Sequence, residues 1–227
     1  MKSMAQLNFE LLAEIHDDLA KIVDKANSHY AKGNFAQESP LQTSMRLAYR
    51  MGLEYYLTAM VLTKVDMVSL ALSAASLVRA LMEVGADIHH IVADPKKMSQ
   101  RAQSYKDSVD AYVEAMQQMA TKMLANEDYT LKHPNAWTSS SIQDRIAALG
   151  IGTVQLYDYF SAFTHANPGY QVYLVEKQLG ETLRFNVQKA ALVHMIDILR
   201  LLAVTGLELD ISQLDRINKK LYTTESN

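Results

Sequence analysis

The chain has 227 residues, and its 22 basic and 25 acidic side chains leave a net charge of -3 with histidine neutral. This balance excludes binding to nucleic acid by bulk charge alone, because such binding needs a strongly basic surface. Hydrophobic residues make up 49% of the chain, which provides for a sizeable core and excludes disorder over most of its length. The absence of cysteine excludes disulfides, thiolate zinc sites, iron–sulfur clusters and cysteine nucleophiles.

No segment of the sequence is typical of a signal peptide or a membrane span. The N-terminal residues lack a basic region followed by an apolar run. The apolar, uncharged stretch Met67 to Val78 is well short of the about 18 residues that a spanning helix needs. We therefore expect a soluble, cytoplasmic protein with no membrane partner.

The apolar spacing predicts helices in the first part of the chain, and prolines fall where the periodicity breaks. The first helix is expected from Gln6 to about Tyr30. The second follows Ser39, the predicted N-cap, with Pro40 at the first helical position. A third helix is predicted from about Val65 to Ala93.

A fourth, long and polar helix is predicted to open at Asp94-Pro95 and to reach about Asn126, with charged faces that indicate partial exposure to solvent. The loop from Asn126 to Ser140 follows it. Ser140 or Ser141 then caps a short helix that runs through Leu149. Later helices are expected at about Thr153–Ala166, Arg184–Thr205 and Ile211–Leu221, with a short extended segment at Gln171–Val175.

Neither an internal repeat nor a low-complexity linker divides the sequence. We therefore predict an all-α protein, a single-domain bundle of about seven or eight helices over residues 1–227. Its parts are a long-helix half at 6–126, a loop at 127–140 and a second helical half at 141–222.

Charged residues interrupt an apolar stripe on the third helix. Arg79, Glu83, Asp87 and His90 share a narrow face with Val68 at about 100° per residue. The spacing of four residues lets Arg79 and Glu83 form a partly buried structural ion pair. Alternatively, Arg79 binds a phosphate or carboxylate group while Glu83 orients it.

A second polar face lies on the helix that begins near Thr153. Tyr157, Ser161, Thr164 and His165 project from one side of it. His165 lies in the last turn, where the helix dipole favours its protonated form. This histidine is expected either to cap the helix or to serve in a site.

The remaining histidines do not belong to a cluster of candidate site residues in the sequence. His194 is predicted to be a core residue that a neighbour satisfies by hydrogen bonding. His16, His29 and His133 are predicted to lie on the surface.

A metal site on the third helix is a further hypothesis, because carboxylate and imidazole groups are the ligands of metal sites in helical bundles. Glu83 and Asp94 lie about 16 Å apart along the axis, so only two adjacent residues could share one ion. Asp87 and His90 are therefore weak metal candidates. The alternative is a polar helix end, and we expect neither a bound metal nor a cofactor.

The segment Leu77–Glu83, then Trp137 with Ser141-Ile142, and then Tyr157-x-x-x-Ser161-x-x-x-His165 resemble an uncharacterised bacterial family of helical proteins. The resemblance covers roughly Leu70 to Tyr173. It implies a shared centre of Arg79, Glu83, Tyr157, Ser161 and His165, but no particular reaction.

The chain is also distantly similar to the HEPN superfamily, which includes metal-independent ribonucleases of toxin and phage-defence systems that work as dimers. Those nucleases carry an arginine followed four to six residues later by histidine. No arginine here is followed by histidine at that spacing. Equivalent chemistry would need Arg79 and His165 to approach each other across packed helices.

The sequence leads us to expect a binding or interaction protein that acts as a homodimer, with the polar centre as a packing network. The alternative is a metal-independent endoribonuclease for RNA or another phosphate-bearing ligand. In it Arg79 binds phosphate, Glu83 orients it, His165 is the general acid or base, and Tyr157 and Ser161 position the substrate. A second alternative is a metal-binding helical-bundle enzyme.

The catalytic hypothesis and the packing hypothesis differ in how accessible to solvent the polar centre should be. An open pocket over His165 would favour catalysis, and full burial would favour a packing role. We further expect the helices of Arg79 and His165 to pack together, with Trp137 and the preceding loop forming a wall beside them.

Overall fold

A computed structural model describes residues 4–32, 37–65, 67–125, 136–164, 173 and 176–223. Over these ranges the chain forms eight helices and no strand, so the predicted all-α multi-helix bundle is confirmed. The extended segment expected at Gln171–Val175 lies outside the described residues, except for Tyr173.

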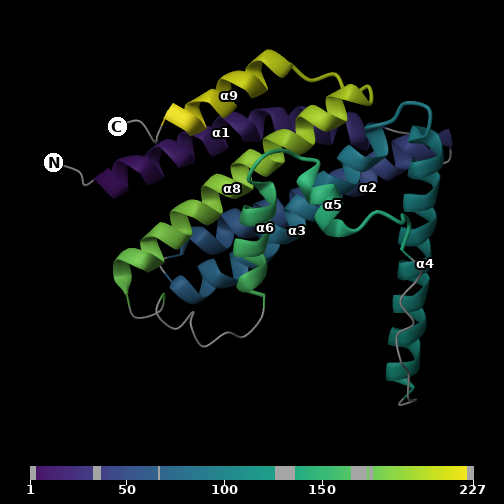
Figure 1. The fold of residues 1–227 in the computed structure, drawn as a ribbon, viewed down its shortest axis with the longest axis horizontal. Coiled ribbons are helices and arrows are strands. Elements are labelled where there is room, and N and C mark those ends of the chain that lie inside the picture. Colours follow the sequence, from purple (N-terminus) through teal and green to yellow (C-terminus); the bar gives the residue numbers. More distant parts are fainter. Residues whose placement is uncertain are drawn as a thin grey trace.

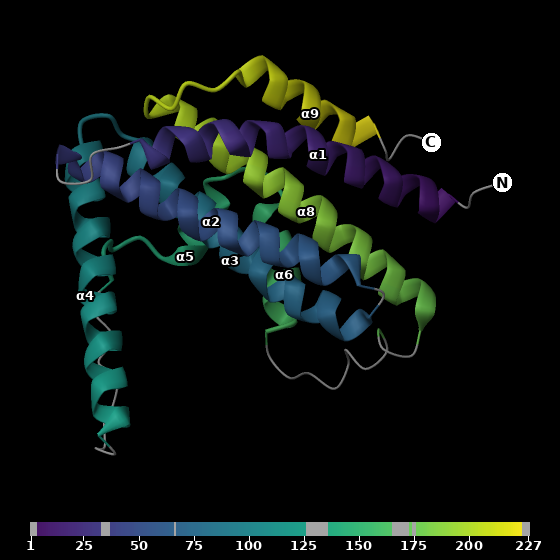
Figure 2. The ribbon, with the colours of Figure 1, turned by 180° about the vertical axis from the view of Figure 1, so that it is seen from behind.

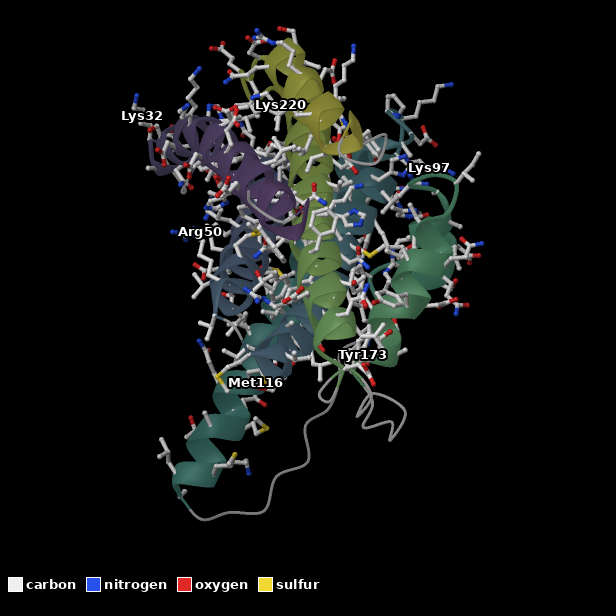
Figure 3. The ribbon with its side chains drawn as sticks, turned by 90° about the vertical axis from the view of Figure 1, so that its left-hand side faces the viewer. Lys32, Arg50, Lys97, Met116, Tyr173 and Lys220 are labelled. Carbon is white, nitrogen blue, oxygen red and sulfur yellow. The ribbon has the colours of Figure 1, made fainter. Side chains whose placement is uncertain are left out.

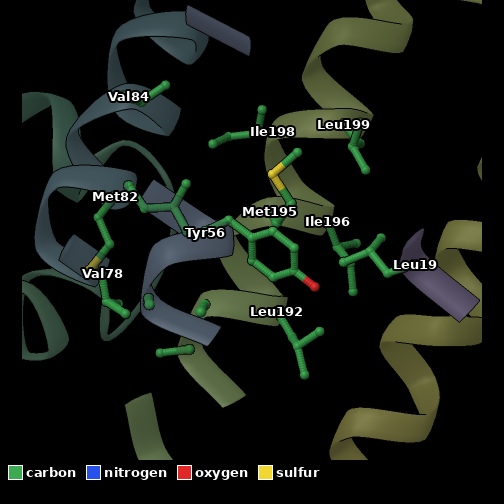
Figure 4. Packing of buried hydrophobic residues seen from close by; sticks show 14 of the residues in the cluster. Leu19, Tyr56, Val78, Met82, Val84, Leu192, Met195, Ile196, Ile198 and Leu199 are labelled. Atoms are coloured by element: carbon green, nitrogen blue, oxygen red, sulfur yellow. The ribbon is translucent and has the colours of Figure 1, made fainter. Parts of the chain in front are cut away.

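Three long helices form the centre of the bundle (Figure 1): α2 at Pro40–Lys64, α3 at Val68–Val92 and α8 at Lys177–Val204. Each packs against the other two. Figure 4 shows the phenol ring of Tyr56 among Met82, Met195 and other apolar side chains of these helices. Gly52 allows the close approach of α8, since a Cβ there would lie 3.1 Å from Ile198 Cδ1.

Two further helices lie along one side of this centre (Figures 1 and 2): α1 at Met4–Ala31 and α9 at Ile211–Thr223. Lys220 of α9 ties them together, because its Nζ lies 3.2 Å from Glu14 and 2.9 Å from Asp18. The ends of the described chain are therefore brought together on α8.

Two short helices cover another face of α3: α5 at Ile142–Ala147 and α6 at Thr153–Ala162. Gly152 forms the turn between them with a φ of 83°, a conformation that residues with a Cβ rarely adopt. The turn reverses the chain so that both helices contact α3. This packing positions the polar face of α6 against Arg79.

Helix α4, at Met98–Leu124, projects away from the bundle (Figures 1 and 2). Of its residues only Ala102 and Tyr105 are buried, both in the first turns. Ser44 of α2 donates a hydrogen bond to the carbonyl of Ala102 at 2.7 Å and so fixes this end. The outer turns extend beyond the other helices.

The predicted capping of α2 is present, whereas that of α4 is wrong. The Ser39 side chain accepts from the backbone of Gln42, and the Gln42 side chain accepts from Ser39 in return. Asp94 instead accepts from the backbone of Lys96 in a turn, so α4 begins only at Met98.

The other helix limits differ from the predictions by up to two turns. Helix α8 begins at Lys177 rather than Arg184. Helix α3 begins at Val68 rather than Val65, and α6 ends at Ala162 rather than Ala166. Ser141, one of the two predicted caps of α5, accepts from the backbone of Asp144 at 3.1 Å.

Among the described helices, α3 alone is long and apolar enough to cross a membrane. It lies in the middle of the bundle and contacts α2, α8, α5 and α6. It also carries Arg79, Glu83 and Asp87 on one face. These contacts are typical of a core helix in a soluble protein.

Candidate functional site

The polar centre predicted from the sequence assembles where α6 crosses α3. Arg79 Nε lies 3.1 Å from Glu83 Oε1. The same Nε donates to the Tyr157 hydroxyl at 3.1 Å, and this hydroxyl donates to Glu83 Oε1 at 2.7 Å. Arginine, glutamate and tyrosine therefore form a closed triangle that joins the two helices.

Tyr157 is the buried member of this triangle. Its side chain is 5% exposed, and the Arg79 guanidinium lies over its ring at 5.3 Å. Burial, together with the hydrogen bond to Glu83, raises the pKa of the phenol. The hydroxyl thus stays protonated near neutral pH and remains the donor to the Glu83 carboxylate.

The charged members of the centre are partly open to solvent. The side chains of Arg79 and Glu83 are 30% and 35% exposed. Arg79 also donates to the Thr164 hydroxyl at 3.3 Å, and that hydroxyl donates to the Ser161 carbonyl at 2.6 Å. The arginine therefore holds α6 at two points, one of them in the turn that follows the helix.

The structure does not bring all five predicted residues into contact. Ser161 Oγ is buried and makes no hydrogen bond with the residues that the structure describes. His165 lies outside the described residues, as does His133. The contact to Thr164, which precedes His165, shows only that Arg79 reaches this part of the chain.

A second ion pair, which the sequence did not reveal, joins α3 to α5. Arg145 Nε lies 2.9 Å from Asp87 Oδ1, with side chains that are 11% and 17% exposed. Burial raises the pKa of Asp87 to about 6, although the charge of Arg145 opposes that rise. Asp87, a weak metal candidate in the sequence, is therefore a structural anchor for α5.

Trp137 packs at this second ion pair and not at the polar centre. Its ring lies against His90 and Tyr105, and the Arg145 guanidinium lies 5.5 Å from its centroid. The expectation that Trp137 forms a wall beside the helices of Arg79 and His165 is therefore wrong, and the loop expected to complete that wall lies outside the described residues except for Ala136. The reason is that Arg145 draws α5 to Asp87, two turns beyond Arg79 on α3.

A pocket of about 340 Å³ lies beside Trp137, lined in part by His90, Lys97 and Arg101. Arg101 donates to the His90 carbonyl at 2.6 Å, and His90 Nε2 lies 3.2 Å from the Thr138 hydroxyl. Burial and the nearby charge of Arg101 lower the pKa of His90. The pocket is thus positively charged through Lys97 and Arg101, and His90 is neutral there.

The metal candidates do not converge. Asp87 faces Arg145, and His90 faces Thr138 and Trp137. Within the described ranges, no three histidine, aspartate or glutamate side chains are grouped so that they could hold one ion.

Two histidines differ from their predictions. His16 is half-buried rather than superficial, and its Nδ1 lies 2.5 Å from the Tyr56 hydroxyl. His194 is buried as predicted, but its Nε2 has no hydrogen-bond partner among the described residues. Burial lowers the pKa of His194 to about 4.

The arrangement around Arg79 can hold α6 on α3, and its partly exposed guanidinium can bind an anion. The residues within it satisfy one another, which is the arrangement of a packing network. The chain matches no protein-family model, no curated protein and no solved structure in the three comparisons.

Proposed function

We propose that the protein is a binding or interaction protein, that it acts as a homodimer, and that the outer half of α4 is its contact surface. The observation that carries the proposal is a group of large apolar side chains exposed on this half of the helix. They are Tyr112 at 45%, Val113 at 47%, Met116 at 36%, Met123 at 63% and Leu124 at 87%.

Exposed apolar side chains that gather on one projecting element are typical of interaction surfaces. In Figure 3, Met116 lies on the part of α4 that extends away from the bundle. The outer half carries no buried residue. Its length and apolar surface therefore contribute little to the core, and a partner would account for them.

The polar centre supports a non-catalytic role. Tyr157 bonds to both Arg79 and Glu83, so these groups are engaged with one another. A closed network of this kind specifies how α6 packs on α3. In this proposal the polar centre holds α6 on α3 and stabilises the bundle from which α4 projects.

The proposal is tested by labelling a single cysteine on the projecting helix. The natural chain has none, so Met116→Cys provides one reactive thiol. Thr121→Cys, at an exposed position on the other side of α4, is the matched control. We expect a bulky maleimide to label both variants at similar rates in dilute protein. Slow labelling of Met116→Cys in a monomeric protein would show that the chain covers this surface itself, and would contradict the proposal.

A metal-independent ribonuclease is the second candidate function. It is favoured by the contact between Arg79 and Thr164, because the residue after Thr164 is His165. In this reading Arg79 binds a phosphate and His165 transfers a proton at the ribose hydroxyl.

The ribonuclease is tested by incubating the full chain with total RNA, with and without a chelator. Wild type should degrade RNA in both conditions, and His165→Ala should not. Arg145→Ala, which breaks the ion pair with Asp87 and leaves all five residues of the polar centre unchanged, is the control for altered packing. Intact RNA with every variant would exclude this function and leave the interaction proposal in place.

A further inference from the structure

The pocket beside Trp137 lies away from the polar centre, where α3 ends and α4 begins. Three segments line it: His90 belongs to α3, Lys97 and Arg101 lie at the start of α4, and Trp137 and Ser139 precede α5. We call it the Trp137 pocket. Its volume of about 340 Å³ falls at the lower end of the range of roughly 300–1,000 Å³ that is usual for small-molecule sites. The pocket is therefore large enough for a small organic ligand.

The lining of the Trp137 pocket is cationic and carries no compensating acid. Among the described residues, none of those that line it is an aspartate or a glutamate. Arg101 donates to the His90 carbonyl at 2.6 Å, and a carbonyl group does not neutralise its positive charge. Lys97 Nζ lies 4.0 Å from Asp94 Oδ2, at the limit of an ion pair and open to solvent, so this pair contributes little. Two positive charges are therefore left for a ligand.

Neutral donors add to the two charges. The hydroxyl groups of Ser104 and Ser139 and the amide of Gln100 line the same pocket. Arginine presents a planar fork of N–H donors that matches the oxygens of phosphate or carboxylate, and hydroxyl and amide groups can donate to the oxygens that remain. A phosphate monoester carries roughly -1.5 to -2 charges at pH 7, whereas a carboxylate carries a single charge. The two cations therefore match a phosphate better than a carboxylate.

Both sides of the pocket are held in place by contacts within the chain. On α4, the carbonyl of Ala102 accepts a hydrogen bond from Ser44 at 2.7 Å. On the other side, Arg145 donates to the Ser140 carbonyl, and its guanidinium lies over the Trp137 ring at 5.5 Å. A site that is formed in advance loses less conformational entropy when a ligand binds.

We propose that the Trp137 pocket binds a small phosphate monoester. Lys97 and Arg101 pair with the phosphate oxygens, and the organic part of the ligand lies beside Trp137. The hydroxyls of Ser104 and Ser139 donate to the same oxygens. This site goes beyond the proposed function, because it lies at the bundle end of α4 and not on the exposed outer half.

Fluorescence titration tests the site, because Trp137 is the only tryptophan of the chain and its emission reports on this pocket. The probes are inorganic phosphate and glycerol phosphate, and the comparison anions are acetate and chloride at the same ionic strength. Isothermal titration calorimetry on the same samples detects binding that leaves the fluorescence unchanged. We expect saturable binding of both phosphate probes, weaker binding of acetate and none of chloride.

Three variants assign the binding to this pocket. Arg101→Ala should weaken it about tenfold or more, because charged hydrogen bonds are lost. Since this variant also loses the contact with the His90 carbonyl, Ser139→Asp is a second one. It places a negative charge in the pocket from an exposed position and should abolish binding. Lys106→Ala, which removes a positive charge from the same helix outside the pocket, is the matched control and should bind as wild type does.

The inference is overturned if neither phosphate probe binds wild type in either measurement. Binding that Ser139→Asp leaves unchanged would overturn it too, because the phosphate would then lie elsewhere. Acetate that binds as tightly as phosphate would contradict the assignment to a phosphate group. Binding of inorganic phosphate but not of glycerol phosphate would mean a site for an adventitious ion only, and would exclude a monoester as the ligand.

Discussion

Asp87 on α3 and Arg145 on α5 form an ion pair with 2.9 Å between Oδ1 and Nε, and both side chains are largely buried. This contact fixes α5 and, through Arg145, the ring of Trp137. Helix α5 has only six residues, so it depends on such tertiary contacts for its position.

We predict that Arg145→Ala destabilises the protein by about 3–5 kcal/mol near neutral pH, because it leaves a buried carboxylate without its partner. Urea unfolding followed by circular dichroism measures this loss. Arg145→Lys, which keeps the charge but loses the planar fork, should cost less.

The loss from Arg145→Ala should depend on pH. Burial already raises the pKa of Asp87 to about 6, and removal of the arginine raises that pKa further. A raised folded-state pKa gives stability that is present at low pH and is lost as pH rises. The variant should therefore be closer to wild type at pH 5 than at pH 8. An equal difference at both values would contradict the assignment of Asp87 as the responsible group.

Removal of the Tyr157 hydroxyl tests the network between α3 and α6. Tyr157→Phe should lower the free energy of unfolding by about 1–2 kcal/mol, since two hydrogen bonds are lost while the ring stays packed. The direct contact between Arg79 and Glu83 at 3.1 Å remains. Arg79→Ala should cost more, about 2–3 kcal/mol, because it also leaves Glu83 without its positive partner. A larger loss for Tyr157→Phe than for Arg79→Ala would contradict this ordering.

His194 should make the protein sensitive to mild acid. Burial lowers its pKa to about 4, so the unfolded chain takes up a proton before the folded chain does. Stability from this residue is therefore present above pH 6.5 and is lost as pH falls towards 4. Between pH 7.5 and pH 5 the loss is roughly 2 kcal/mol.

The comparison of wild type with His194→Leu isolates this effect from the opposite one of Asp87. The variant should gain stability relative to wild type as pH falls from 7.5 to 5, as measured by urea unfolding. A difference that does not change with pH would show that His194 accepts a proton in the folded protein.

Two glycines give contrasting packing predictions. A Cβ on Gly180 would lie 2.4 Å from Val68 Cγ2, so Gly180→Ala should destabilise by about 1–3 kcal/mol. A Cβ on Gly85 would lie 3.6 Å from Ile198 Cγ1, an ordinary contact. Gly85→Ala should therefore be neutral or stabilising by up to about 1 kcal/mol, because alanine favours the helix. Thermal melts of the two variants measure both effects, and a tolerated Gly180→Ala would contradict the contact between the start of α8 and Val68.

The sequence predicts those features that depend on local spacing. Ser39 caps α2 because its side chain and that of Gln42 lie three residues apart. Polar residues lie on otherwise apolar helix faces at Arg79, Glu83 and Tyr157. Polar groups in such positions usually form hydrogen bonds with one another. The helices and the three residues of this contact can therefore be predicted from the sequence.

Contacts that depend on where one helix packs against another cannot be predicted from the sequence in the same way. Arg145 lies on a short helix after a loop, so its distance from Asp87 follows from the path of the chain and not from spacing. Trp137 is placed by the same docking. His194 was expected to have a hydrogen-bonding neighbour, but the surrounding helices present none among the described residues.

The role of α4 also depends on the fold. Its sequence combines charged residues with a regular apolar seam, and such a seam is equally compatible with packing inside one chain. Only the projection of the helix shows that Tyr112 to Met123 lies beyond the bundle (Figure 1).

Sedimentation velocity over a range of protein concentrations tests most directly whether the outer half of α4 joins two copies. Wild type should change from a 25.5 kDa monomer towards twice that mass as concentration rises. Met116→Glu should remain monomeric with an unchanged melting temperature, because its side chain lies outside the core. A wild-type protein that stays at 25.5 kDa at every concentration, or a Met116→Glu variant that still forms dimers, would contradict this account.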